Sequence, residues 1–141
     1  MPALHDTLQV VPDDTAVAQA LHWLKILAQR EDWPPRAGFG LTLSVDEALT
    51  NIVSYAFADG RRVSPAVCLA YRRRGTDLIV DIRDNGHPYD PTLTAAPELA
   101  DSLDESEEGG HGLRLMRHYL KDIRYQRMRG ENRLTLIVTT E

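Results

Sequence analysis

Apolar residues recur at helical spacing in three stretches of the chain. The first stretch, residues 15–29, follows an Asp-Asp pair that can cap a helix. The paired prolines of DWPPRAG predict a loop after it, and a second helix is expected over residues 39–58, where an Asp-Gly pair follows as a typical stop. A third helix is expected to begin near His111.

Shorter segments of β type surround these helices. Residues 66–72 and 78–83 are separated by a segment that contains Arg-Gly-Thr-Asp, and they predict a hairpin. A second hairpin is expected from residues 123–128 and 133–139, with a turn at 129–132, and residues 7–11 form a further strand candidate. Helices mixed with hairpins predict an α+β fold, a two-layer α/β sandwich with about three helices on one face of a mainly antiparallel mixed sheet.

Composition and charge narrow the class of protein. The length of 141 residues, 43% of them hydrophobic, suits a single domain over residues 1–141. The net charge of −5 disfavours direct nucleic-acid binding, and the single cysteine, Cys68, excludes an internal disulfide framework. No segment approaches the ~18 apolar residues of a membrane span, and no secretory signal is present, so a cytoplasmic protein without membrane contact is expected.

The second predicted helix carries Glu47 and Asn51 one turn apart, away from its apolar stripe. These residues are either a solvated face or the lining of a cleft, since an i,i+4 pair directs both side chains to one place. An amide oxygen is a hard ligand suited to Mg²⁺, and a carboxylate beside it can serve as a general base.

Asp84 follows a β segment on the side of its apolar residues, where a carboxylate is costly without a hydrogen-bond donor. Asn85-Gly86 then turns the chain. The group is either a simple turn or a site where Asp84 accepts a hydrogen bond from a ligand amine and Gly86 lets a flat ring approach the backbone.

Residues 90–110 contain prolines, small residues and an acidic cluster, without one basic residue. They lead into Gly-Gly-His-Gly-Leu at 109–113, just before the third predicted helix. Glycines at a helix start expose N–H groups that favour an anion, although such glycines are also common between loops and helices. The chain has no P-loop, no GxGxxG, no G-x-S-x-G and no His/Cys cluster with metal-ligand spacing.

The order and spacing of Glu-x-x-x-Asn, Asp-x-Gly and Gly-x-Gly resemble the GHKL (Bergerat-fold) ATPase superfamily. More closely, nearly the whole chain resembles the RsbW/SpoIIAB-type anti-sigma-factor serine/threonine-protein kinases. DEALTNIVSYAF matches the N box of that group, DNGHPYDP its first glycine box, and the segment from Gly109 its second glycine box and terminal hairpin. Pro88 replaces a glycine of the wider superfamily, as is common in the small kinases.

The resemblance implies a site for ATP and Mg²⁺. Asn51 would coordinate the metal, and Glu47 would be the catalytic general base toward a serine hydroxyl. Asp84 would read the adenine amino group, Gly86 would make room for the ring, and residues 89–109 would form the ATP lid. The loop and helix end that hold the phosphates would include Gly110, His111, Gly112 and Leu113.

Two functions compete on this basis. The first is a kinase of a partner-switching system that phosphorylates a serine on a STAS-domain antagonist and sequesters a sigma factor or another regulator. The alternative is a nucleotide-dependent binding module with negligible kinase turnover, and a structural adaptor with a dead pocket is a third reading. Family analogy also suggests a homodimer.

Overall fold

The computed structural model describes residues 5–57, 66–93 and 112–141. In chain order these residues form β1, α1, α2, a π-helix, β2, β3, a short 3₁₀ turn, a helix over residues 112–119, β4 and β5. Their bounds are β1 His5–Val10, α1 Ala16–Glu31, α2 Pro35–Asn51, π-helix Ile52–Ala56, β2 Val67–Arg74, β3 Asp77–Asp84, 3₁₀ turn Pro91–Leu93, β4 Asp122–Met128 and β5 Glu131–Thr139.

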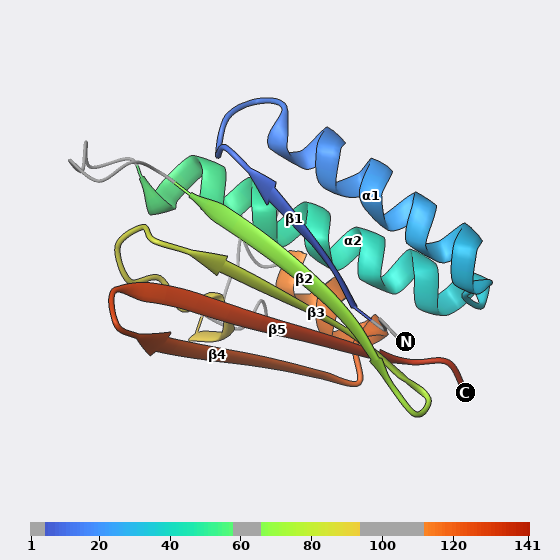
Figure 1. Ribbon diagram of the computed structural model, residues 1–141. Coiled ribbons are helices and arrows are strands. Elements are labelled where there is room, and N and C mark those ends of the chain that lie inside the picture. Colours follow the sequence, from blue (N-terminus) through green and yellow to red (C-terminus); the bar gives the residue numbers. More distant parts are fainter. Residues whose placement is uncertain (1–4, 58–65, 94–111) are drawn as a thin grey trace.

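The five strands form one sheet in the order β1-β2-β3-β5-β4, and every neighbouring pair is antiparallel. The predicted α+β sandwich is confirmed, since the helices cover one face of this sheet (Figure 1). The expectation of a mixed sheet was wrong for the described strands. Each hairpin adds its own antiparallel pair, and β5 returns antiparallel beside β3, so no parallel crossover arises among them.

The core lies between the sheet and the helices, where the apolar face of the strands packs against the apolar faces of the helices. Alternate residues of β3 point to the helices and are buried, as Leu78, Val80 and Ile82 show. On α2, Leu41 and Val45 are fully buried against them. Burying one such side chain contributes roughly 1.5–3 kcal/mol, so these layers hold the site elements in place. No helix among the described residues is long and apolar enough to span a bilayer.

The start of α2 differs from the prediction. The helix begins at Pro35, four residues before the expected start at 39, and part of DWPPRAG is its first turn. A proline in the first helical turn has no unsatisfied N–H and already holds a helical φ, so it starts this helix and does not break it. The α-helix ends at Asn51 and continues as the π-helix to Ala56; the predicted stop at Asp59-Gly60 lies outside the described residues.

The second hairpin is tighter than expected. Only Arg129 and Gly130 form its turn, with φ of 55° and 80°, and β5 begins at once with Glu131. Two successive residues at positive φ are typical of the two-residue turns that match the twist of a hairpin. The expected turn at 129–132 therefore included two residues that belong to the strand.

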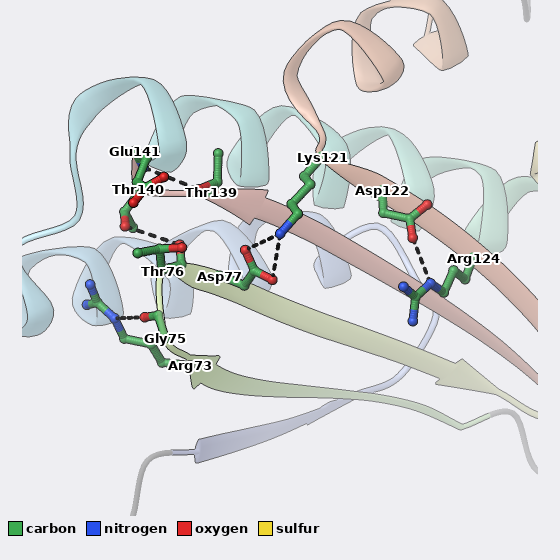
Figure 2. A network of polar contacts seen from close by, with 10 residues as sticks. All are labelled: Arg73, Gly75, Thr76, Asp77, Lys121, Asp122, Arg124, Thr139, Thr140 and Glu141. Carbon is green, nitrogen blue, oxygen red and sulfur yellow. Dashed lines mark hydrogen bonds and ion pairs between the residues drawn. The ribbon is translucent and has the colours of Figure 1, made fainter.

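Polar contacts tie the strands together at the end of β3 that lies far from Asp84 (Figure 2). Lys121, just before β4, places its ammonium 3.0 Å from Asp77 Oδ1. Thr140, just after β5, donates its backbone N–H to Thr76 O at 2.8 Å. These contacts close the far end of the sheet, while the residues with predicted chemistry gather at the other end.

Candidate functional site

Glu47 and Asn51 lie at the C-terminal end of α2, where the helix changes to a π-helix. Asn51 Nδ2 lies 3.4 Å from Glu47 Oε2, and both side chains are half-buried. The backbone N–H of Ile52 is shared between the carbonyls of Ala48 and Leu49. Such π segments are frequent at functional sites. The predicted i,i+4 juxtaposition is confirmed, on a face only partly exposed to water.

Asp84 ends β3 on the helix side of the sheet and is only 4% exposed. Its Oδ1 accepts hydrogen bonds from the Gly86 N–H and from Asn132 Nδ2, both at 2.9 Å. Burial raises the pKa of the Asp84 carboxyl, and these two hydrogen bonds, with the charge of Arg127, oppose the increase. The predicted core-side carboxylate is present and has the donors that burial demands.

The turn after Asp84 docks on the π-helix. His87 donates its backbone N–H to Ala56 O at 3.0 Å, and His87 Nε2 lies 2.8 Å from Tyr55 O. A Cβ on Gly86 would lie 2.5 Å from Ala56 O. The glycine is thus required by this close approach of two backbone segments, a constraint that the sequence prediction of room for a ligand ring did not include.

A cavity opens between α2, the π-helix and the sheet, with about 420 Å³ of space that is partly open to solvent. Small-molecule sites are mainly apolar with a few placed polar groups. The lining of this cavity follows that description: Ala48, Asn51, Ile52, Ala56, Asp84, Tyr89, Pro91, Met116, Tyr125, Asn132 and Leu134.

The helix over residues 112–119 begins beside Glu47. A Cβ on Gly112 would lie 2.7 Å from Glu47 Oε1 and closer still to its Cδ and Oε2. The start of this helix, the predicted anion-binding end, is therefore next to the predicted base. Leu113 is buried, so its side chain packs in the protein. Gly110 and His111 lie outside the described residues, as does the part of the predicted lid after residue 93.

The structure therefore brings Glu47, Asn51, Asp84, Gly86 and Gly112 to one end of the fold. Glu47 itself does not line the cavity but borders it through Asn51. A magnesium ion held by nucleotide phosphates needs only one or two protein oxygens, and the Asn51 amide with the nearby carboxylate is a suitable hard donor set. Among the described residues no group of three or more His, Cys, Asp or Glu forms a metal cluster.

Sequence reasoning missed Asn132 and Tyr125. Asn132 was assigned to the turn of the second hairpin, yet it lies in β5, is 4% exposed and contacts Asp84 directly. Tyr125 in β4 donates its hydroxyl to Asn132 Oδ1. A signal was available: Asn132 continues the alternation of Leu134 and Leu136 backwards, which places a polar residue on an apolar strand face.

Comparison with known proteins agrees with this geometry. The sequence matches the family described as "Histidine kinase-like ATPase domain" over residues 10–138. It is 46% identical over 136 residues to the serine/threonine-protein kinase BtrW of Bordetella bronchiseptica, covering 96% of this chain and 94% of that protein. The structure of the RsbU and RsbW domains of a Mycobacterium tuberculosis protein superposes with a TM-score of 0.63 at 13% identity, over 98% of this chain and 33% of that one. The chain therefore belongs to the histidine kinase-like ATPase domain family.

Proposed function

We propose that this protein is an ATP-dependent serine/threonine-protein kinase of a partner-switching system. The proposed substrate is a serine on a STAS-domain antagonist, and the proposed alternate partner is a sigma factor or another regulator that the protein sequesters, as a homodimer. Membership in an ATPase family supports ATP as the nucleotide, and the kinase BtrW, 46% identical, supports phosphoryl transfer to a hydroxyl side chain.

One observation carries the proposal: the Glu47 carboxylate lies within 3.4 Å of the Asn51 amide and beside Gly112 at the start of a helix. Phosphoryl transfer needs mainly positioning and charge neutralisation. In the proposed arrangement Asn51 would hold Mg²⁺ and Gly112 would belong to the phosphate-holding helix end. Glu47 would take the proton of the serine hydroxyl as its oxygen bonds to the γ-phosphorus and ADP leaves. A module that only binds nucleotide has no use for a base at this position.

The base of the nucleotide is proposed to occupy the cavity at Asp84. The cavity is mainly apolar, as a flat aromatic ring requires, and Asp84 is a buried acceptor at its wall. An acceptor at this place suits the amino group of adenine. Gly110, His111 and Leu113 join Gly112 in the proposed phosphate site, and residues 89–109 form the proposed lid.

The decisive experiment is Glu47→Gln with two readouts. ATP binding is measured by calorimetry, and phosphoryl transfer is measured with purified STAS-domain antagonist and an antagonist whose acceptor serine is replaced by alanine. The proposal expects ATP binding close to wild type and phosphoryl transfer reduced by 10²-fold or more, in the range of general-base contributions of about 10²–10⁴. Asp46→Asn is the matched control, because Asp46 precedes Glu47 on α2 and its carboxylate accepts a hydrogen bond from Thr50 Oγ1 at 3.3 Å on the same helix.

The alternative, a nucleotide-dependent binding module, gives a different result. Wild type would then bind ATP and a partner, yet no serine-dependent phosphoryl transfer would be detected before or after the Glu47 substitution. Transfer that survives Glu47→Gln unchanged would instead remove Glu47 from the role of base.

A further inference from the structure

We propose that Asn132 is a positioning residue that sets Asp84 for recognition of an amino-bearing base and so gives the site its preference for adenine over bases with a carbonyl at the same place. This inference rests on the proposed function, in which Asp84 receives the adenine amino group. It adds a residue of β5, and through it Tyr125 of β4, to the determinants of nucleotide selectivity.

The amide of Asn132 is held in one orientation. Its Nδ2 donates to Asp84 Oδ1 and to the His87 carbonyl, both at 2.9 Å. Its Oδ1 accepts from the Tyr125 hydroxyl and from the Tyr89 N–H, which lies at 3.4 Å. A reversed amide would place its oxygen against two acceptors and its NH₂ group against two donors, so the network permits only one orientation.

With the Asn132 amide in this orientation, the two oxygens of Asp84 have different roles, one bonded within the protein and one left for the cavity. Oδ1 receives both the Asn132 amide and the Gly86 N–H, which occupies the acceptor directions of that oxygen. Oδ2 takes part in no hydrogen bond among the described residues, and Asp84 lines the cavity wall. Oδ2 is therefore the oxygen left to accept a hydrogen bond from a ligand.

The hydrogen bond from Asn132 to Asp84 also determines which edge of a nucleotide base can bind. Burial raises the pKa of Asp84, and the Asn132 hydrogen bond is the foremost influence that lowers it. An ionised Asp84 only accepts hydrogen bonds and suits an amino group. A protonated Asp84 can donate, and it would suit the carbonyl oxygen of hypoxanthine or guanine equally well. Without Asn132 the selectivity for an amino group should therefore decline.

A purely structural role for Asn132 makes a different prediction. Asn132 is the direct cross-strand neighbour of Asp84 in the β3–β5 pair, so the contact also helps to hold the two strands in register. Loss of register would lower the stability of the protein and weaken the binding of all nucleotides alike. A positioning role changes the ratio of affinities for two nucleotides and changes its dependence on pH.

The test compares wild type, Asn132→Ala and Tyr125→Phe by calorimetric titration with ATP and with inosine triphosphate, which carries a carbonyl where ATP carries the amino group. Each protein is titrated with both nucleotides at several pH values. For Asn132→Ala, ATP binding should weaken about tenfold or more, with much less change for inosine triphosphate, as expected for a lost hydrogen bond to a charged group. As the pH is lowered, the preference for ATP should be lost at a higher pH in Asn132→Ala than in wild type. Tyr125→Phe keeps the Asn132 amide and should shift the ratio in the same direction by less.

Thr135→Val is the matched control. Thr135 lies three residues further along β5 and donates its hydroxyl to Asp81 Oδ1 at 2.5 Å, so its loss also removes a hydrogen bond to a buried aspartate. Asp81 faces the opposite side of the sheet from Asp84. The variant should lose stability without a change in the ratio of the two affinities.

Each outcome decides one claim. If wild type binds no adenine nucleotide, the proposed function fails, and this inference falls with it. If wild type prefers ATP but both variants keep the wild-type ratio and pH profile, the proposed function stands and the positioning role of Asn132 is wrong. Should Asn132→Ala fail to fold, Tyr125→Phe alone carries the test, and an unchanged ratio in that variant overturns the inference.

Discussion

The Glu47 carboxylate occupies the space that a side chain at position 112 would need. A Cβ built on Gly112 would lie 2.7 Å from Glu47 Oε1 and nearer to the other carboxylate atoms. Real Cβ atoms essentially never come so close to a neighbour. Glycine at 112 is therefore a condition for placing the Glu47 carboxylate at the start of the helix over residues 112–119.

Gly112→Ala should displace Glu47 and reduce phosphoryl transfer far more than it reduces stability. Forcing a methyl group into this packed contact costs about 1–3 kcal/mol unless the flexible carboxylate moves, and movement takes Glu47 from its place. Thermal unfolding and single-turnover transfer separate the two effects. Gly38→Ala is the control, because the nearest atom to its added Cβ is Trp33 Cε3 at 3.8 Å, an ordinary van der Waals contact. Full transfer activity in Gly112→Ala would contradict the proposed position of the base.

Asp84→Asn should stabilise the nucleotide-free protein at neutral pH. Because burial raises the pKa of Asp84 above its ordinary value of 3.8, the folded state binds this proton more readily than the unfolded chain. The resulting stability is fully present below the unfolded pKa and is lost as pH rises through the folded pKa. Asparagine cannot ionise, so the variant avoids the buried charge at neutral pH. Its melting temperature should exceed that of wild type there, and the gap should shrink as pH falls toward 3.8.

Asp81→Asn provides the contrasting control for that experiment. Asp81 is also 4% exposed and lies on the same strand, but its carboxylate is paired with Arg72 at 2.7 Å and accepts the Thr135 hydroxyl. Removing this charge leaves the guanidinium without its partner, so the melting temperature should fall. If both asparagine variants shift stability in the same direction, the burial of the Asp84 charge is not the cause of its effect.

Asn51→Ala should remove the magnesium-dependent part of nucleotide binding. A ligand that binds only the folded state stabilises it by RT ln(1 + [L]/Kd), about 2.7 kcal/mol at a hundredfold excess over Kd. Wild type should therefore melt higher with ATP and higher again with ATP and Mg²⁺, and chelation should remove the second increment. Asn51→Ala should show only the first. Thr50→Ala, an exposed neighbour on α2, should retain both increments. Retention of the metal increment by Asn51→Ala would exclude Asn51 as the metal ligand.

Local pattern was enough to predict most of the fold and the grouping of Glu47 with Asn51. Apolar periodicity identified α1, α2 and both hairpins, because burial of one face sets that periodicity. It located Asp84 on the apolar side of β3 for the same reason. The boundaries of helices and strands were predicted wrongly at residues whose type is common in two structural roles. Pro35 was interpreted as a helix breaker although it starts α2. Asn132 was interpreted as a turn residue although it lies in β5.

The unpredicted parts of the site depend on contacts between distant segments. Asn132 and Asp84 are 48 residues apart, and no local pattern states that their side chains meet. The reason for glycine at 86 is likewise tertiary, since it depends on the carbonyl of Ala56 in the π-helix. Gly86 and Gly112 are both predicted site residues, and the folded arrangement shows what each one touches.

Gly86→Ala should therefore impair nucleotide binding by moving the turn away from the π-helix. Its new Cβ would lie 2.5 Å from Ala56 O and 2.7 Å from Ala56 Cβ, and the carbonyl cannot rotate away as a flexible side chain can. Separation of the turn breaks the bond from the His87 N–H to Ala56 O and shifts the Asp84 end of β3. ATP affinity should fall at least about tenfold, since such a shift loses a hydrogen bond to a charged group. Ala56→Gly in the Gly86→Ala background removes only the contact with Cβ, so it should restore binding at most in part. Complete recovery in the double variant would show that the alanine side chain, and not the backbone carbonyl, sets the requirement for glycine at 86.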